Sequence, residues 1–231
     1  MKKKVLIIAC HPDDEILGCG GFLDKYKNQY KFKVIFLAEG SSWRYKDKVK
    51  YEFNINRDIA SRQNSAIKAL KLFSISDVSF FNHACGQLNK VPQTILNKII
   101  EDQIQIFRPN IIFTHSNKDL NLDHQTIVKS VLVATRPTSI KNIISEIYSF
   151  EILSSTEWNF YYKKKSFNPN YFIDITSTID KKIKAAKAYK NEINAWPHPR
   201  SIKGIKNLAK YRGQSVGLKY AEAFYLLRDI A

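Results

Sequence analysis

The chain has 231 residues, 44% of them hydrophobic, so it is long enough to bury one sizeable core and too short to need two. Its formal net charge is +16, and residues 160–231 carry 15 Lys and Arg against 5 Asp and Glu. No apolar run reaches the roughly 20 residues that span a bilayer, and no signal-peptide pattern is present. Residues 1–231 are therefore expected to form a single cytoplasmic domain without a transmembrane segment.

The excess of basic residues admits several partners. A nucleic acid, an anionic membrane surface or a phosphorylated substrate would each be attracted, but lysines on solvated helix faces give the same composition. We take solvated helix faces as the simplest explanation and expect no nucleic acid partner.

The chain has three cysteines, Cys10, Cys19 and Cys85, and they form no CxxC pair. This argues against disulfides and against a thiolate zinc cluster, and it favours small buried residues.

Strand-like apolar runs alternate with stretches of helical period along most of the chain. This alternation predicts an α/β fold, a Rossmann-like three-layer sandwich with a mostly parallel sheet. If the first five strands take the common order 3-2-1-4-5, a binding crevice opens at the carboxyl ends of the first and fourth strands. The expected strands are 5–9, 33–38, 78–81, 111–114 and 144–150, and the expected helices are 54–73, 93–107, 125–134 and 177–193.

Ionisable residues crowd the end of the first strand. The segment Ala-Cys-His-Pro-Asp-Asp-Glu places His11 and the carboxylates of Asp13, Asp14 and Glu15 there. Such crowding needs a charge partner, and a divalent cation supplies one because it takes neutral imidazole and carboxylate as ligands. Of two adjacent aspartates, one can bind the metal while its neighbour approaches a water molecule.

A second imidazole reaches the same crevice after the fourth strand, where His124 opens a helical pattern. A His, Asp and His donor set with a fourth position left open is typical of a catalytic zinc site rather than a closed structural one. His115 directly follows the fourth strand, and a structural role suits it as well as a site role. It is left out of the predicted metal set.

At these residues the chain resembles the PIG-L/LmbE-like family of zinc-dependent N-acetylglucosaminyl deacetylases. The signature of that family is a His-Pro-Asp-Asp-Glu loop after the first strand, matched at 11–15, and a later Asp-His pair, matched at 123–124. The resemblance runs over nearly the whole chain. Its weaker parts are Arg62 and the segments 107–110, 197–201 and 221–224.

The resemblance implies a role for each residue of the first motif. His11, Asp14 and His124 would hold a Zn²⁺ ion, and Asp13 would be the general base that activates water. Glu15 would support them from behind.

Further roles follow for residues outside that loop. Asp123 would orient a neighbouring polar group, and Arg62 would hold substrate. Many family members have a His where this chain has Asn121, which can donate a hydrogen bond but cannot act as an acid. The segment Pro-His-Pro-Arg reads as a rigid loop presenting His198 as an oxyanion donor and Arg200 as a substrate contact.

The expected function is hydrolysis of the acetamido group of an N-acetylglucosamine-type amino sugar, with or without an attached phosphate. A zinc amidohydrolase for another acyl group, such as formyl, remains open. So does a non-enzymatic basic module that binds nucleic acid or an anionic surface around a structural metal. The aromatic group Trp158, Phe160, Tyr161 and Tyr162 suggests packing or a homo-oligomer contact.

Overall fold

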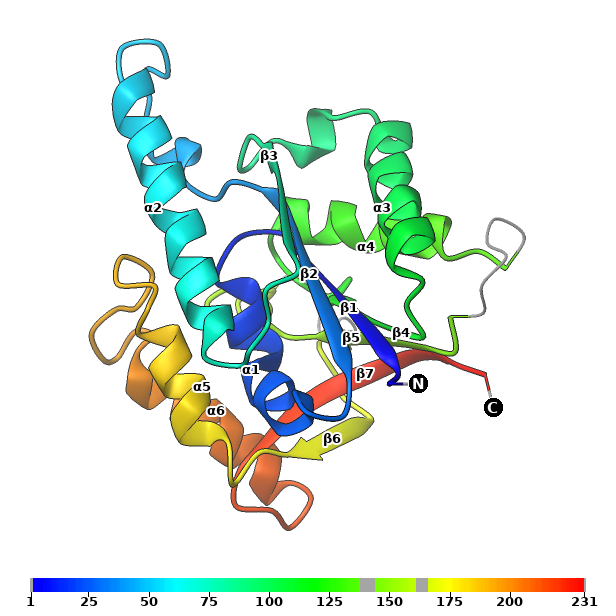
Figure 1. The fold of residues 1–231 in the computed structure, drawn as a ribbon. Helices are drawn as coiled ribbons and strands as arrows, with labels where there is room; N and C mark the ends of the chain where they lie inside the picture. The colour runs from blue at the N-terminus through cyan, green and yellow to red at the C-terminus, as the bar shows by residue number, and fades with distance from the viewer. Residues whose placement is uncertain (1, 138–143, 161–165, 231) are drawn as a thin grey trace.

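The computed structural model describes residues 2–137, 144–160 and 166–230. Seven strands form one sheet in the order β3-β2-β1-β4-β5-β7-β6 (Figure 1). The first five strands are mutually parallel, and β7 runs antiparallel to both β5 and β6. The strands are β1 (Lys4–Ala9), β2 (Lys31–Ala38), β3 (Val78–His83), β4 (Ile111–His115), β5 (Glu146–Phe150), β6 (Tyr171–Asp174) and β7 (Ala221–Asp229).

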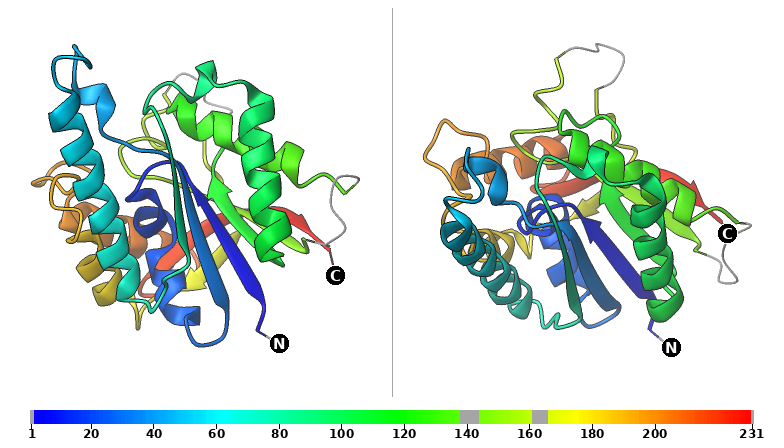
Figure 2. Two further views of the ribbon diagram at one scale, coloured as in Figure 1. Left: turned by 45° about the horizontal axis from the view of Figure 1, so that its top comes forward. Right: turned by 90° about the horizontal axis from the view of Figure 1, so that it is seen from above.

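Helices cover both faces of the sheet (Figure 2). One hydrophobic cluster packs α1, α2, α5 and α6 against one face, and a second packs α3 and α4 against the other. The predicted three-layer α/β sandwich is confirmed. The helices are α1 (Asp14–Tyr26), α2 (Glu52–Lys71), α3 (Gln93–Phe107), α4 (Leu122–Ala134), α5 (Ile179–Ala186) and α6 (Ile202–Gln214).

The five expected strands and their order 3-2-1-4-5 are present. The strands β6 and β7 and the helices α1 and α6 were not among the elements whose bounds were predicted. The predicted helix 177–193 is too long, because α5 ends at Ala186. The residues beyond it form turns, in which Tyr189 and Glu192 make tertiary contacts with the α1 and α2 side of the site. Those contacts outweigh the helical period of the sequence.

The centre of the sheet is buried on both sides, which explains the unbroken apolar run of β1. Val5 and Ile7 enter one core cluster while Leu6 and Ile8 enter the other, and all four are fully buried. Such continuous runs are typical of parallel strands covered by helices. Because β1 pairs with β4 in parallel register, the carboxyl ends of these two strands lie side by side.

The first helix is kinked at Cys19, whose φ of −143° is not helical. The kink releases the backbone N–H groups of Gly21 and Phe22, and both donate hydrogen bonds of 2.7 Å to the Glu222 carboxylate on β7. The Lys182 ammonium on α5 pairs with the same carboxylate at 2.6 Å. A buried ion pair thus ties α1, α5 and β7 together.

The glycines of α1 permit close packing of this helix. A Cβ on Gly18 would lie 2.5 Å from the Phe150 ring, and one on Gly21 would lie 2.6 Å from Ile175. No side chain larger than hydrogen fits there without movement of its neighbours.

Two further expectations from the sequence concern an oligomer contact at the aromatic segment and the lack of a transmembrane segment. Trp158 and Phe160 are 39% and 80% exposed, whereas Tyr161 and Tyr162 lie outside the described residues, so an oligomer contact at this segment stays a prediction. Within the described ranges, no helix combines the length and the apolar character needed to cross a membrane.

Replacing Glu222 with Gln should lower the free energy of unfolding by about 2–4 kcal/mol, because the substitution leaves the buried Lys182 ammonium without its counter-charge. Urea denaturation measures the loss. The exposed Glu52→Gln variant is the control and should change stability by no more than roughly 0.5 kcal/mol. Equal stability of the two variants would contradict a structural role for the pair.

Candidate metal centre and active site

The turn from β1 into α1 is closed on itself by its own hydrogen bonds. The His11 backbone N–H donates to Asp14 Oδ2 at 2.8 Å, and the Asp14 N–H donates to the His11 carbonyl at 3.2 Å. Asp13 has a φ of 134°, a region that favours glycine and costs a residue with a side chain about 1–3 kcal/mol. The surrounding contacts must therefore hold this turn in place.

Three atoms at the base of the crevice form a nearly equilateral triangle. His11 Nδ1 lies 3.5 Å from Asp14 Oδ2, His124 Nε2 lies 3.4 Å from Asp14 Oδ2, and the two nitrogens are 3.4 Å apart. Ligands at zinc bond lengths in a tetrahedral site are separated by about 3.3–3.5 Å. Asp14 Oδ1 is also buried and has no hydrogen-bond partner in the described part of the chain. These residues fit a zinc ion with a fourth position open.

A carboxylate lies behind each imidazole of this triangle. Asp123 Oδ2 is 3.5 Å from His11 Nε2, and Asp119 Oδ2 is 3.2 Å from His124 Nδ1. Carboxylates placed in this way fix the ring orientation and the tautomer of metal-ligating histidines. The resemblance implied that Asp123 orients a neighbouring polar group, and the polar group next to it is His11.

Asp119 was not predicted as a site residue. Its carboxylate is fully buried and accepts hydrogen bonds from the hydroxyls of Ser155 and Thr156 and from the Asn121 backbone N–H. Its place in the loop between β4 and His124 was the available signal. The two hydroxyls that hold it come from a distant loop, which the sequence does not connect to it.

His115 ends β4 beside the triangle, but its coordinating nitrogen is engaged. Cys10 donates its backbone N–H to His115 Nε2 at 2.8 Å, and the ring stacks on His124 with centroids 4.0 Å apart. Burial, reinforced by the neighbouring His124, lowers the pKa of His115 to about 3. The ring is therefore neutral and acts as a hydrogen-bond acceptor.

Two cysteines approach the opposite nitrogen of His11. Cys85 Sγ and Cys10 Sγ lie 3.1 and 3.4 Å from His11 Nε2, and all three cysteines are buried and free. His11, Cys85 and Asp123 form a further group whose donor atoms could hold a metal, on the other side of the imidazole. Burial raises the pKa of the Cys10 thiol, which keeps it protonated. The sequence had indicated the burial of these cysteines but not their place at the site.

Asp13 points to two guanidinium groups. Its Oδ2 accepts from Arg200 Nη1 at 2.8 Å and lies 3.1 Å from Arg62 Nη2, while Oδ1 has no hydrogen-bond partner in the described part of the protein. Burial raises the pKa of Asp13, and the charges of Arg62 and Arg200 only partly offset that effect. One oxygen of a buried, more basic carboxylate is thus left for proton transfer.

Arg62 is 8% exposed, and all three of its nitrogens have partners within the protein. Nε donates to the Pro12 carbonyl at 2.8 Å, and Nη1 donates to the Gly40 carbonyl at 2.5 Å and lies 3.0 Å from Glu192. Nη2 faces Asp13. The side chain therefore supports the strained turn from behind.

Glu15 lies beneath Asp13 and is fully buried. Its Oε2 accepts the Asp13 backbone N–H at 3.0 Å, and its Oε1 accepts the Tyr189 hydroxyl. Burial raises the pKa of Glu15 to about 8. Its contacts place it behind the turn, and its support of the metal ligands stays a prediction.

A cavity of about 590 Å³ opens at His11, one corner of the triangle. Asn121 caps α4 by accepting the Asp123 backbone N–H on its side-chain oxygen, so its amide nitrogen remains as a donor at the cavity. His198 Nδ1 accepts the Arg200 backbone N–H at 3.0 Å, which leaves the Nε2–H of the neutral ring as a donor. His11, Asn121, His198 and Arg200 all line this cavity.

The Asp119→Asn substitution should raise the dissociation constant for zinc about 10- to 100-fold, because the amide no longer fixes the orientation and basicity of His124. Competition with a chromophoric chelator measures this constant. Asp102→Asn, on an aspartate that pairs only with the exposed Lys98 among the described residues, is the matched control and should bind zinc as the parent does. An unchanged constant in Asp119→Asn would show that His124 needs no such support.

Solved structures share this fold. A conserved protein from Thermus thermophilus matches with a TM-score of 0.75 and 19% identity, covering 98% of this chain and 96% of its own. The 4-carboxy-2-hydroxymuconate hydratase from Pseudomonas putida KT2440 matches with a TM-score of 0.73 and 21% identity, covering 99% and 98%. A shared fold does not specify the reaction, so only the residues of the site can do so.

Sequence comparison is more specific. A diacetylchitobiose deacetylase from Thermococcus kodakarensis is 25% identical, over 99% of this chain and 84% of the relative. The model of the PIG-L family, described as GlcNAc-PI de-N-acetylase, matches residues 6–135 and so spans both predicted motifs. The chain belongs to the PIG-L family, as its two motifs predicted.

Proposed function

We propose that this protein is a zinc-dependent N-deacetylase that hydrolyses the acetamido group of an N-acetylglucosamine-type amino sugar and releases acetate. The triangle of His11, Asp14 and His124, with the buried Asp13 next to Asp14 in the chain and a cavity that opens at His11, carries the proposal. Family membership and the deacetylase named among the relatives support it.

A Zn²⁺ ion held by His11, Asp14 and His124 would polarise the amide carbonyl and lower the pKa of water at the open position. Asp13 takes the proton of the attacking water on its unpartnered Oδ1 and returns it to the amine as the C–N bond breaks. Its raised pKa suits the first step, because a more basic carboxylate accepts the proton more readily.

The oxyanion that develops on the carbonyl needs donors from the cavity. The Asn121 amide and the His198 Nε2–H are two donors that line it. We assign oxyanion stabilisation to this pair. The assignment accounts for Asn121 at a position where other family members have His, since donation alone is required of it.

The two arginines that contact Asp13 have different roles. Arg62 is buried behind the carboxylate and positions it, in place of the substrate contact that the resemblance implied. Arg200 is 18% exposed in its side chain and lines the cavity, so it can contact Asp13 and substrate together. Location in the cytoplasm and assembly into a homo-oligomer stay predictions.

An acetate-release assay on neutral N-acetylated amino sugars tests the reaction. Activity should be lost with a chelator and should return with zinc. Asp13→Asn should reduce kcat about 10²- to 10⁴-fold while zinc stays bound, since the amide cannot accept a proton. The exposed Asp180→Asn is the matched control. Near-parental kcat in Asp13→Asn would refute the assignment of the base. If N-formyl analogues released formate while the N-acetyl sugars released no acetate, the acyl group removed would be formyl in place of acetyl.

Substitution of Arg62 by Lys separates positioning from substrate binding. A lysine keeps the charge but cannot contact Pro12, Gly40 and Asp13 together. If Arg62 positions the base, kcat should fall roughly 10- to 100-fold with little change in KM. A rise in KM at constant kcat would instead show that Arg62 binds the substrate.

A further inference from the structure

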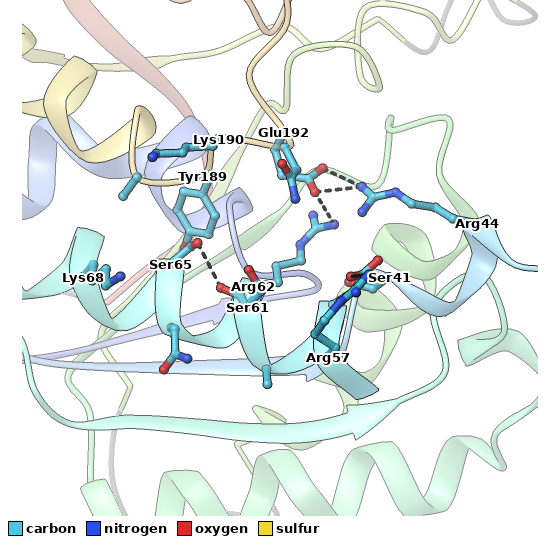
Figure 3. Close-up of a pocket in the computed structure, with 15 residues that line it drawn as sticks. Ser41, Arg44, Arg57, Ser61, Arg62, Ser65, Lys68, Tyr189, Lys190 and Glu192 are labelled. Atoms are coloured by element: carbon cyan, nitrogen blue, oxygen red, sulfur yellow. Dashed lines mark hydrogen bonds and ion pairs between the residues drawn. The ribbon is translucent and has the colours of Figure 1, made fainter. Parts of the chain in front are cut away.

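A second cavity, of about 540 Å³, adjoins the one above the metal triangle (Figure 3). One wall is the side of α2 that carries Arg57, Ser61 and Lys68. The other is the turn segment 188–192 that follows α5. We call this cavity the α2 groove.

The α2 groove carries more positive than negative charge. Its lining has two acidic residues, Asp58 and Glu192, and a larger set of cations: Arg44, Arg57, Arg62, Lys68 and Lys190. Figure 3 shows Glu192 between two of these cations, and its carboxylate lies 2.7 Å from Arg44 and 3.0 Å from Arg62. Asp58 accepts the Tyr45 hydroxyl at 2.7 Å and lies 3.5 Å from Arg57.

Two of the cations are not neutralised in this way. Within the described ranges, neither Lys68 nor Lys190 pairs with an acidic side chain, and both are exposed. They come from the two opposite walls of the α2 groove. An anion between the walls would therefore meet positive charge on both sides.

Hydroxyl groups stand between the charges along α2. Arg57, Ser61, Ser65 and Lys68 follow one another at intervals of three or four residues, which places them on one helix face. Guanidinium, ammonium and hydroxyl donors spaced along one surface are the groups that bind phosphate oxygens. An uncharged sugar would not require the cations.

The α2 groove is continuous with the active-site cavity. Arg44, Arg62, Asn191 and Glu192 line both. Arg62 in turn contacts Asp13. A ligand with its acetamide at the metal triangle could thus extend past the Arg44–Glu192 pair into the groove.

We propose that the α2 groove is a phosphate-binding subsite, so that the substrate is an N-acetylated amino sugar that carries a phosphoester or diphosphate. This inference rests on the proposed deacetylase function for the identity of the sugar, but the binding of phosphate itself does not depend on it. The phosphate can belong to a nucleotide or to a lipid headgroup, and both present the same oxygens to the groove.

Calorimetric titration of the zinc-loaded protein with glucose 1-phosphate tests the binding directly. This probe carries a phosphate and no acetamide. The Lys68→Glu/Lys190→Glu double variant should weaken binding at least roughly tenfold, because it reverses the charge on both walls. Lys71→Glu/Lys210→Glu changes the net charge equally at exposed positions outside the groove, and it should bind as the parent does. Equal affinities for the two double variants would overturn the proposal.

Substrate preference gives the second readout. The ratio of kcat/KM for a phosphorylated over a neutral N-acetylated amino sugar should fall at least about tenfold in Lys68→Glu/Lys190→Glu and stay constant in the control variant. A nucleoside-diphosphate-linked sugar and a lipid-phosphate-linked sugar in micelles, compared side by side, identify the source of the phosphate. A ratio unaffected by the groove variant would overturn the subsite as part of substrate binding.

The two proposals fail differently. Loss of phosphate binding in the groove variant, with no acetate from any sugar, would contradict the deacetylase and leave the anion subsite standing. If neutral sugars were deacetylated and the groove variant bound phosphate as the parent does, the phosphate subsite would be contradicted and the deacetylase would stand.

Discussion

The Asp14 carboxylate is fully buried, and the rest of the site is arranged around that charge. Its Oδ2 lies within 3.5 Å of a nitrogen of His11, of His115 and of His124. A buried carboxylate without compensation costs several kcal/mol, so the fold must bring positive charge or hydrogen-bond donors to it. The side-by-side carboxyl ends of β1 and β4 do so. The chain after β1 brings the His11 backbone N–H, which donates to Asp14 Oδ2 at 2.8 Å, and the chain after β4 brings His124.

Adjacent aspartates acquire opposite properties from this arrangement. Burial would raise the pKa of Asp14, but the charge of His124 and the hydrogen bonds from His11 and His124 hold it well below its usual range. The pKa of Asp13 is raised by burial despite Arg62 and Arg200. Two neighbouring carboxyls whose pKa values are pushed apart can serve as permanent ligand and as proton acceptor. The strained φ of Asp13 aims the two side chains in different directions.

The α/β fold could be predicted because its central strands are continuous apolar runs, and those runs also located the crevice. The three predicted ligands were recognisable for a related reason, since each directly follows such a strand or opens the next helix. The contacts that the sequence did not reveal join distant segments. Ser155 and Thr156 hold Asp119, and the Pro12 and Gly40 carbonyls accept hydrogen bonds from Arg62. Neither set of contacts is encoded in a local pattern.

The length of α5 shows the same limit. Residues 187–193 continue the helical period, yet Tyr189 bonds to Glu15 and Glu192 to Arg44 and Arg62, which requires turns in place of helix. These turns join the α2 groove to the catalytic cavity. The part of the chain that local propensity describes least well is thus the part that connects the two candidate binding regions.

X-ray absorption at the zinc edge of the zinc-loaded protein tests the metal assignment most directly. Ligation by His11 Nδ1, Asp14 and His124 Nε2 predicts a first shell of nitrogen and oxygen alone at about 2.0–2.2 Å. A sulfur ligand at about 2.3 Å would instead place the ion either with His11, Cys85 and Asp123 or with Cys10, His11 and His124. It would contradict the assignment of His11, Asp14 and His124 as the catalytic metal ligands.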